Sequence, residues 1–194
     1  MRNIVLILLT FILAACEEPK MPSPFHAQDI SWQYAQPDFQ LTDFNGKLRT
    51  LVEFREKVVV LYFGYMHCPD VCPTTLADLS LILRQLGRDA DRVQVVFITL
   101  DPERDKPQML AKFVPSFDSS FLGLYGDAQV TAQAAKSFGV DYIRQYDQHG
   151  GYTLDHTDGV YLLGIGGKPL LRSPHGQSPD RLARDIKLLL AIGR

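Results

Sequence analysis

The sequence has few cysteines, no surplus of positive charge and only one dense apolar run. Its 194 residues include three cysteines, and 20 Lys and Arg side chains stand against 22 Asp and Glu. A charge balance this close to neutral provides no polycationic surface for a phosphate backbone, so we expect no nucleic-acid partner. With 46% hydrophobic and 22% charged residues, the composition is that of one globular domain and excludes disorder and collagen-like repeats.

The dense apolar run covers residues 4–15, which is too short to cross a bilayer, since a spanning helix needs about 20 residues. Arg2 precedes the run and two alanines end it, which is the order of an export signal. The segment Leu13-Ala14-Ala15-Cys16 resembles the lipobox of bacterial lipoproteins, whose Cys becomes the acylated first residue. The alternative is an ordinary signal peptide followed by a chance Cys.

We therefore expect a lipoprotein signal peptide over residues 1–15, then a lipidated Cys16 and a tether over residues 16–37. The tether is Pro-rich, charged and poor in core-forming residues. One domain should follow over residues 38–194. This arrangement predicts an exported protein, anchored by lipid to the periplasmic face of a bacterial membrane.

Acylation of Cys16 leaves Cys68 and Cys72 as the remaining thiols in an oxidising compartment. Two sulfurs cannot make a disulfide scaffold, nor a four-cysteine zinc site. The pair is therefore a single disulfide, a redox couple or half of a metal site.

The hydrophobic pattern predicts alternating strands and helices. Residues 58–63 read as a buried central strand, residues 93–100 as a second strand, and the amphipathic stretch from Pro73 to Gly87 as the helix between them, in a parallel βαβ unit. The other expected elements are a hairpin over residues 39–51 with a two-residue Asn45-Gly46 turn, helices over 107–113 and 127–138, strands over 140–146, 160–163 and 168–172, and a last helix capped by Ser178.

Both thiols should lie at the start of the helix from Pro73, where the partial positive charge of the helix N-terminus lowers a Cys pKa. A spacing of four residues places Cys68 and Cys72 on one helical face, where they can converge on one ion. The spacing also permits a disulfide, although a structural disulfide closing so short a loop would constrain little.

A soft ion suits two thiolates, and Cu(I) is the first choice. A third ligand must come from elsewhere in the chain. His156 stands in a polar connection just before the strand at 160–163, on a loop that can face the cysteine turn. The histidines to choose from are His26, His67, His149, His156 and His175.

Three motifs in this order resemble the Sco (SenC) family. They are Gly64-Tyr65-Met66-His67-Cys68-Pro69-Asp70-Val71-Cys72-Pro73, then Asp101-Pro102-Glu103-Arg104-Asp105, then Asp155-His156-Thr157 before Tyr161-Leu162. The similarity runs from about residue 38 to the C-terminus. Sco proteins are copper chaperones implicated in assembling the dinuclear copper centre of cytochrome c oxidase subunit II.

The resemblance implies an α/β, thioredoxin-like fold with a central mixed β-sheet flanked by helices and an N-terminal β-hairpin. It also implies copper ligation by Cys68, Cys72 and His156, as Cu(I) or Cu(II). The expected function is a membrane-anchored metallochaperone that takes copper from an upstream periplasmic donor and delivers it to subunit II or a related oxidase.

Two other functions are weighed against this one. A thiol-disulfide reductase could keep the oxidase cysteines reduced, but the spacing is CxxxC rather than CxxC and His156 has no task in it. A peroxidase needs an Arg and a Thr beside its Cys, and residues 64–72 contain neither. We expect a metallochaperone rather than an enzyme, with thiol-disulfide oxidoreductase activity as the alternative.

Departures from the family pattern are limited to two places. Met66 stands where a small hydroxyl residue is common and is interpreted as packing. Residues 164–167, Gly-Ile-Gly-Gly, replace an acidic turn. We interpret the segment from Asp101 to Asp105 as a capped turn before the 107–113 helix rather than as ligands, and Asp70 as a solvated turn carboxylate.

Overall fold

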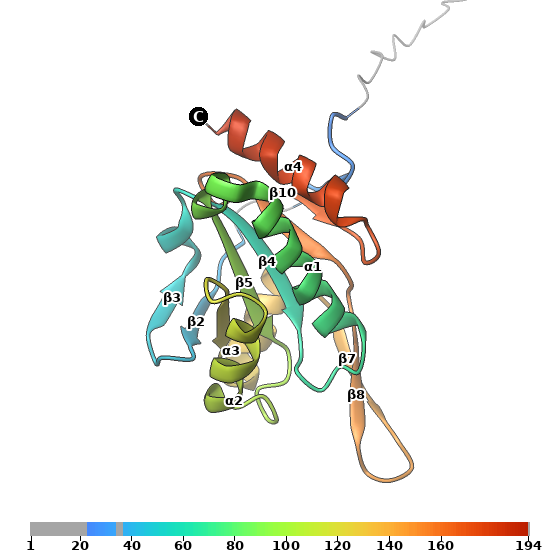
Figure 1. The fold of residues 1–194 in the computed structure, drawn as a ribbon. Coiled ribbons are helices and arrows are strands. Elements are labelled where there is room, and N and C mark those ends of the chain that lie inside the picture. The colour runs from blue at the N-terminus through green and yellow to red at the C-terminus, as the bar shows by residue number, and fades with distance from the viewer. Residues whose placement is uncertain (1–22, 34–36, 194) are drawn as a thin grey trace, which may run out of the picture.

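A mixed sheet of eight strands carries the fold, in the order β1-β10-β9-β4-β5-β6-β2-β3. The computed structural model describes residues 23–33 and 37–193 (Figure 1), so the predicted signal peptide and Cys16 lie outside the described residues. At the centre, β4 (Val58–Gly64) pairs in parallel with β5 (Val93–Thr99) and antiparallel with β9 (Val160–Leu163). Every residue of β4 is buried, as its β-branched and aromatic run predicts for a strand covered on both faces.

The remaining elements surround this centre. The other strands of the large sheet are β1 (Gln28–Asp29), β2 (Gln40–Asp43), β3 (Leu48–Thr50), β6 (Leu122–Tyr125) and β10 (Pro169–Ser173). The α-helices are α1 (Val71–Leu86), α2 (Pro107–Phe113), α3 (Ala128–Ser137) and α4 (Pro179–Ile192). Short 3-10 turns are η1 (Leu51–Phe54), η2 (Gly87–Arg92) and η3 (Val114–Ser116). No helix among the described residues is long and apolar enough to span a membrane.

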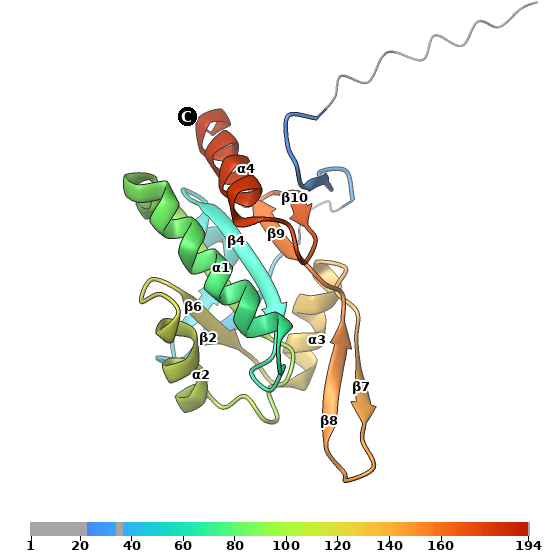
Figure 2. The same cartoon turned by 45° about the vertical axis from the view of Figure 1, so that its right-hand side comes forward.

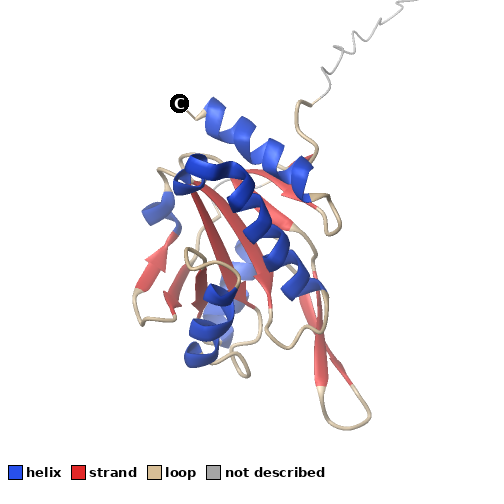
Figure 3. Cartoon of the chain, viewed as in Figure 1, coloured by secondary structure: helices blue, strands red, loops and turns tan. Residues whose placement is uncertain are grey.

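Helices cover both faces of the sheet. α1 and α4 lie side by side on one face and α3 lies behind the other (Figures 1 and 2). Because successive strand side chains point to opposite faces, Tyr62 faces α1, whereas Phe63 packs on Phe138 beyond α3 with ring centroids 5.6 Å apart. This layered arrangement, with helices in blue and strands in red in Figure 3, is the predicted α/β architecture.

The predicted N-terminal hairpin is β2 and β3, but its turn differs from the prediction. The N–H of Asp43 donates to the carbonyl of Lys47 at 2.8 Å, so residues 44–46 form a three-residue loop and the predicted two-residue turn is wrong. Gly46 takes the left-handed conformation, with φ of 83°, that this loop requires. The Asp43 carboxylate accepts the N–H groups of Asn45 and Lys47, which stabilises the longer loop.

Helix α1 begins at Val71, two residues before the predicted start. Pro73 is tolerated there because N–H groups in a first helical turn have no partner within the helix. α2 has the predicted bounds. Asp127 caps α3 as predicted, accepting the N–H of Val130, whereas Ser178 occupies the cap position of α4 without a side-chain bond.

Three strands, β1, β6 and β8 (Tyr152–His156), are absent from the prediction, and β7 (Tyr142–Tyr146) starts later than predicted. β7 and β8 pair in a separate two-stranded sheet. This hairpin projects from the body of the protein (Figure 2). The prediction of a polar connection before residue 160 is therefore wrong for the residues of β8. Only Leu154 of this strand is buried, so the sequence carries little sign of a strand there.

The folded part of the chain reaches further toward the N-terminus than residue 38. β1 pairs with β10, and the N–H groups of His26 and Ala27 donate to the buried carboxylate of Asp185 on α4 at 2.9 and 2.8 Å. Part of the segment assigned to the tether thus packs on the domain.

Candidate metal centre

The two cysteines lie at the carboxyl end of β4, but in different settings. Cys72 is buried in the first turn of α1, whereas Cys68 is half-buried in the turn before the helix. Both thiols are free. The N–H of Cys72 donates to Sγ of Cys68 at 3.3 Å, so a donor from the first turn of α1 points at the other sulfur. The predicted pairing on one helical face is therefore replaced by a turn-to-helix contact.

Cys72 is enclosed by aromatic side chains and by the backbone of β4. The Tyr62 hydroxyl lies beside its sulfur, and a Cβ placed on Gly64 would come within 3.0 Å of that sulfur. Burial raises the pKa of the Cys72 thiol to about 12. The prediction of a lowered pKa is wrong for Cys72, because the loss of hydration outweighs the charge at the helix N-terminus.

His156 is the last residue of β8 rather than a loop residue. Its Nδ1 lies 2.9 Å from the carbonyl of Thr157, which can accept only an N–H, so the bonded tautomer leaves Nε2 free to bind a metal. The His156 ring meets the Tyr65 ring edge-on, with centroids 6.3 Å apart. Because Tyr65 belongs to the turn that carries Cys68, the structure places His156 against the cysteine turn.

A pocket between α1 and β9 joins these elements further. Tyr62, Val71 and His156 are among the residues that line it. The predicted histidine and the start of the cysteine-bearing helix thus border one hollow.

The three predicted ligands are close but are not gathered into one cluster. Among the described residues, the only trio of His, Cys, Asp or Glu side chains with ligand atoms all within 4.8 Å of one another is His67, Asp101 and Asp105. Binding of one ion by Cys68, Cys72 and His156 therefore requires a side chain or the hairpin to move.

The trio itself is a hydrogen-bonded structural unit. The Asp105 carboxylate accepts hydrogen bonds from the N–H of Met66 at 2.9 Å and from the hydroxyl of Thr99 at 2.6 Å. Nδ1 of His67 lies 3.3 Å from its other oxygen. Both carboxylates are buried, and burial raises the pKa of Asp105. Asp101 accepts its bonds from other partners, so all four carboxylate oxygens are already engaged.

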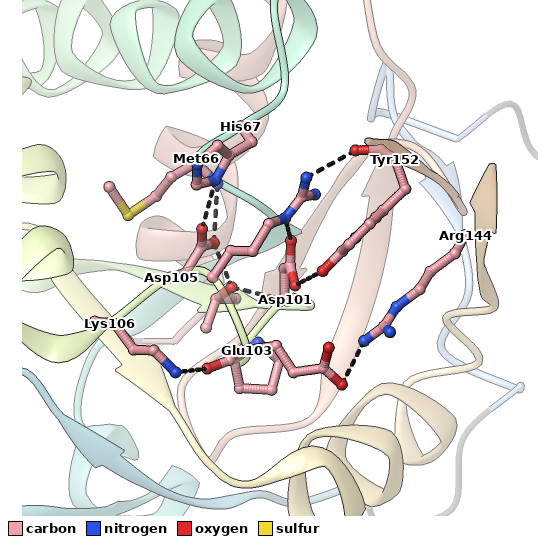
Figure 4. A network of polar contacts seen from close by, with 11 residues as sticks. Met66, His67, Asp101, Glu103, Asp105, Lys106, Arg144 and Tyr152 are labelled. Carbon is pink, nitrogen blue, oxygen red and sulfur yellow. Dashed lines mark hydrogen bonds and ion pairs between the residues drawn. The ribbon is translucent and has the colours of Figure 1, made fainter. Parts of the chain in front are cut away.

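Asp101 joins the same unit to the β7–β8 hairpin. It accepts the Tyr152 hydroxyl at 2.8 Å and Nε of Arg104 (Figure 4). Arg104 in turn donates to the backbone carbonyl of Tyr152 at 2.8 Å. The capped turn expected over residues 101–105 exists, with the N–H groups of Arg104 and Asp105 bonded to the carbonyl of Asp101. Its contacts with Met66 and Tyr152 were not predicted, since both partners are distant in the sequence.

The sequence is similar to that of one known protein family. A family model described as SCO1/SenC matches residues 28–191. The mitochondrial SCO2 homolog of Homo sapiens is 42% identical over 162 residues, covering 82% of this chain and 61% of that protein. The Bos taurus counterpart is 42% identical over 152 residues, covering 77% and 54%. The chain thus spans between half and two thirds of the length of these relatives.

Solved structures agree with the fold. The copper-bound structure of ScoI from Bradyrhizobium japonicum is 40% identical, with a TM-score of 0.72, covering 78% of this chain and 97% of that one. Copper-bound yeast Sco1 is 28% identical, with a TM-score of 0.74, covering 81% and 89%. The predicted thioredoxin-like α/β fold is confirmed.

Proposed function

The chain belongs to the SCO1/SenC family, and we propose that it is a copper-binding protein that serves the assembly of a cytochrome c oxidase. The observation that supports this most strongly is the approach of His156, through Tyr65, to a turn with two free thiols. Two similar proteins, from Bradyrhizobium japonicum and yeast, have been solved with copper bound.

In this proposal Cys68, Cys72 and Nε2 of His156 hold one copper ion as cargo. Two thiolates suit Cu(I), and the imidazole suits either Cu(I) or Cu(II). Cys68, the half-buried thiol, is the ligand that a client can reach first, so ligand exchange would begin there. The buried Cys72 must lose its proton on binding, which makes copper uptake release a proton from a thiol whose pKa is raised to about 12.

The cellular setting is part of the same proposal. A lipidated Cys16 would hold the domain at the periplasmic face of a bacterial membrane, close to subunit II of the client oxidase. An upstream periplasmic protein would donate the copper. Residues 1–22, on which the anchor depends, lie outside the described residues.

One observation favours the alternative of a thiol-disulfide reductase. A half-buried Cys68 beside a buried Cys72 is the arrangement of an attacking and a resolving thiol. In that function His156 has no chemical task, which makes it the residue that separates the two candidates.

Anaerobic titration of the full-length protein in detergent with Cu(I), against a competing chelator, tests the copper site. We expect one tightly held Cu(I) per chain, lost in Cys72→Ser. His156→Ala should keep Cu(I) but lose most Cu(II) binding, because nitrogen is the better match for the harder ion. His149→Ala, at an exposed position near the hairpin tip, is the matched control. Equal copper binding by the wild type and Cys72→Ser would contradict the proposal.

Complementation separates the chaperone from the reductase. His156→Ala leaves both sulfurs in place, so its dithiol redox activity should survive. In cells that lack the native protein, we expect this variant to fail in oxidase assembly. Full assembly together with unchanged Cu(II) spectra would favour the reductase.

A further inference from the structure

The position of His156 is not fixed by the main sheet. β7 and β8 pair only with each other among the described strands, so no backbone ladder joins them to β4 or β9. After His156 the chain reaches β9 through residues 157–159, which end at Gly159 with φ of 101°. A two-stranded hairpin on a short connection containing glycine depends on side-chain contacts for its orientation.

Tyr152 makes the most extensive of these contacts, with Arg104. The Arg104 guanidinium carbon lies 3.5 Å from the centroid of the Tyr152 ring, and its Nη1 donates to the carbonyl of Tyr152. The Tyr152 hydroxyl bonds to Asp101. Ring, backbone and hydroxyl of one hairpin residue are thus all held by the turn after β5. Stacking of this kind requires the planar guanidinium and is not reproduced by an ammonium group.

Arg104 is itself anchored to the body and also approaches the cysteine turn. Its Nε donates to the buried Asp101, while its Nη2 has no hydrogen-bond partner among the described residues. Its guanidinium carbon lies 5.9 Å from the centroid of the Tyr65 ring, and the Tyr65 ring contacts the His156 ring edge-on. One side chain therefore lies between the hairpin that bears His156 and the turn that bears Cys68.

We propose that Arg104 is a positioning residue that sets the place of His156 relative to Cys68 and Cys72 by holding Tyr152. The inference rests on the proposed function, in which His156 binds copper. Because the three ligand atoms do not all lie within 4.8 Å of one another, the position of the hairpin decides whether the imidazole reaches the ion. Loss of Arg104 removes the stack and the bond to the Tyr152 carbonyl, and leaves the hairpin held to this turn by the Tyr152 hydroxyl on Asp101 and by the Arg144–Glu103 ion pair. The hairpin is then held less firmly, so the imidazole contact weakens while the two sulfurs are untouched.

The test compares substitutions that remove different parts of the contact. Arg104→Lys keeps the positive charge beside Asp101 and loses the stack, whereas Tyr152→Leu loses both ring and hydroxyl. Tyr152→Phe removes only the hydroxyl bond. Arg49→Lys is the matched control, since Arg49 is also half-buried and pairs with a buried carboxylate, that of Asp43 at 2.8 Å, in the β2–β3 hairpin.

Two readouts are needed, one of them on the copper-free protein. In the copper-free protein, we expect the backbone amides of β8 to exchange with solvent about tenfold faster in Arg104→Lys and Tyr152→Leu. In Cu(II)-loaded protein, electron paramagnetic resonance should show weaker nitrogen hyperfine coupling, with Cu(II) affinity reduced about tenfold and Cu(I) affinity nearly unchanged. Tyr152→Phe, which keeps the ring on Arg104, should change both readouts less than Tyr152→Leu, and Arg49→Lys should stay close to the wild type in both.

The outcomes separate the inference from the function on which it rests. If His156→Ala leaves the Cu(II) spectrum unchanged, the three-ligand site itself fails. If His156→Ala changes the spectrum but Arg104→Lys and Tyr152→Leu do not, Arg104 does not position the ligand. Should Arg104→Lys merely lower the unfolding free energy as Arg49→Lys does, with a wild-type spectrum and wild-type amide exchange in β8, its role is structural and the inference is overturned.

Discussion

The carboxylate of Asp105 accepts a hydrogen bond from the backbone N–H of Met66, 39 residues earlier in the chain, at 2.9 Å. Thr99, the last residue of β5, bonds to the same oxygen. Since β4 and β5 are parallel neighbours, their carboxyl ends meet at one edge of the sheet, and Asp105 ties together the turns that follow them. The cysteine turn is thus held by a buried acid that is not itself a predicted ligand.

Asp105→Asn should reveal the cost of ionising that acid. Burial raises the folded-state pKa of Asp105 above 3.8, so the folded state binds the proton more tightly than the unfolded state does. The stability contributed by protonated Asp105 is complete below pH 3.8 and is lost as pH rises through the folded pKa. The unfolding free energy of the wild type, relative to Asp105→Asn, should therefore fall across that window.

Urea denaturation at closely spaced pH values from about 3.5 upward measures this difference. The titratable groups that face Asp105 are Asp101 and His67, so the comparison is repeated in a His67→Gln background. A difference that rises with pH, or that does not change, would contradict the effect of burial.

The thiols should differ in reactivity. Cys72 is buried and its pKa is raised to about 12, so only a very small fraction of Cys72 side chains are thiolates at neutral pH. With reduced, metal-free protein at pH 8, we expect iodoacetamide to modify Cys68 at least about 100-fold faster than Cys72. Mass spectrometry of Cys68→Ser and Cys72→Ser, each with one thiol of the pair, gives the two rates. Similar rates for the two thiols would contradict the burial of Cys72 and its raised pKa.

Gly64→Ala should disturb the thiol site from within the sheet. The added methyl group would lie 3.0 Å from both Sγ of Cys72 and the Phe97 ring, closer than ordinary contact. Overpacking of this kind costs about 1–3 kcal/mol of unfolding free energy. We also expect faster modification of Cys72, because its enclosure must open.

Gly123→Ala is the matched control for that substitution. Gly123 lies on β6, away from the cysteines, and its added methyl group would also come within 3.0 Å of a neighbour, the Val114 side chain. Thermal or urea unfolding should show a loss of similar size in both variants. Only Gly64→Ala should change the labelling of Cys72, and an equal change in Gly123→Ala would assign the effect to general loosening.

Processing of the N-terminus follows from Leu13-Ala14-Ala15-Cys16. Mass spectrometry of the membrane fraction should find a mature chain that begins at a lipid-modified Cys16. The anchor should be stable, because bacterial lipoproteins carry two or three acyl chains and a single chain binds only marginally. In a Cys16→Ser variant the protein should no longer be lipid-modified. An unmodified N-terminus at another residue would contradict the lipoprotein prediction.

Strong local patterns made much of the fold predictable. The unbroken apolar run of β4, the leucine spacing of α1 and the proline that opens α2 each identify their element without tertiary information. Where one residue carries the signal, prediction failed. β8 buries Leu154 alone, and it pairs only with β7, so its pattern resembles that of a polar loop.

The site was predictable as a set of residues but not as an environment. Motif order singled out Cys68, Cys72 and His156, and their role as ligands stays a prediction. The raised pKa of Cys72 depends on Tyr62 and the rest of the core, and no local pattern reports how deeply a first helical turn is buried. The link from Asp101 to Tyr152 crosses 51 residues, so sequence spacing alone gave no indication of it.

The outer edge of β8 is closed without a strand. Arg104 donates to the carbonyl of Tyr152, and the Tyr65 hydroxyl lies beside the backbone of Leu154, so two side chains cover positions that a neighbouring strand would otherwise take. Exposed strand edges are templates for unwanted strand addition and aggregation. The side chains around the cysteine turn therefore also protect β8 from intermolecular pairing, which leaves β7, with its exposed Ile143 and Tyr146, as the edge of this hairpin more open to another chain.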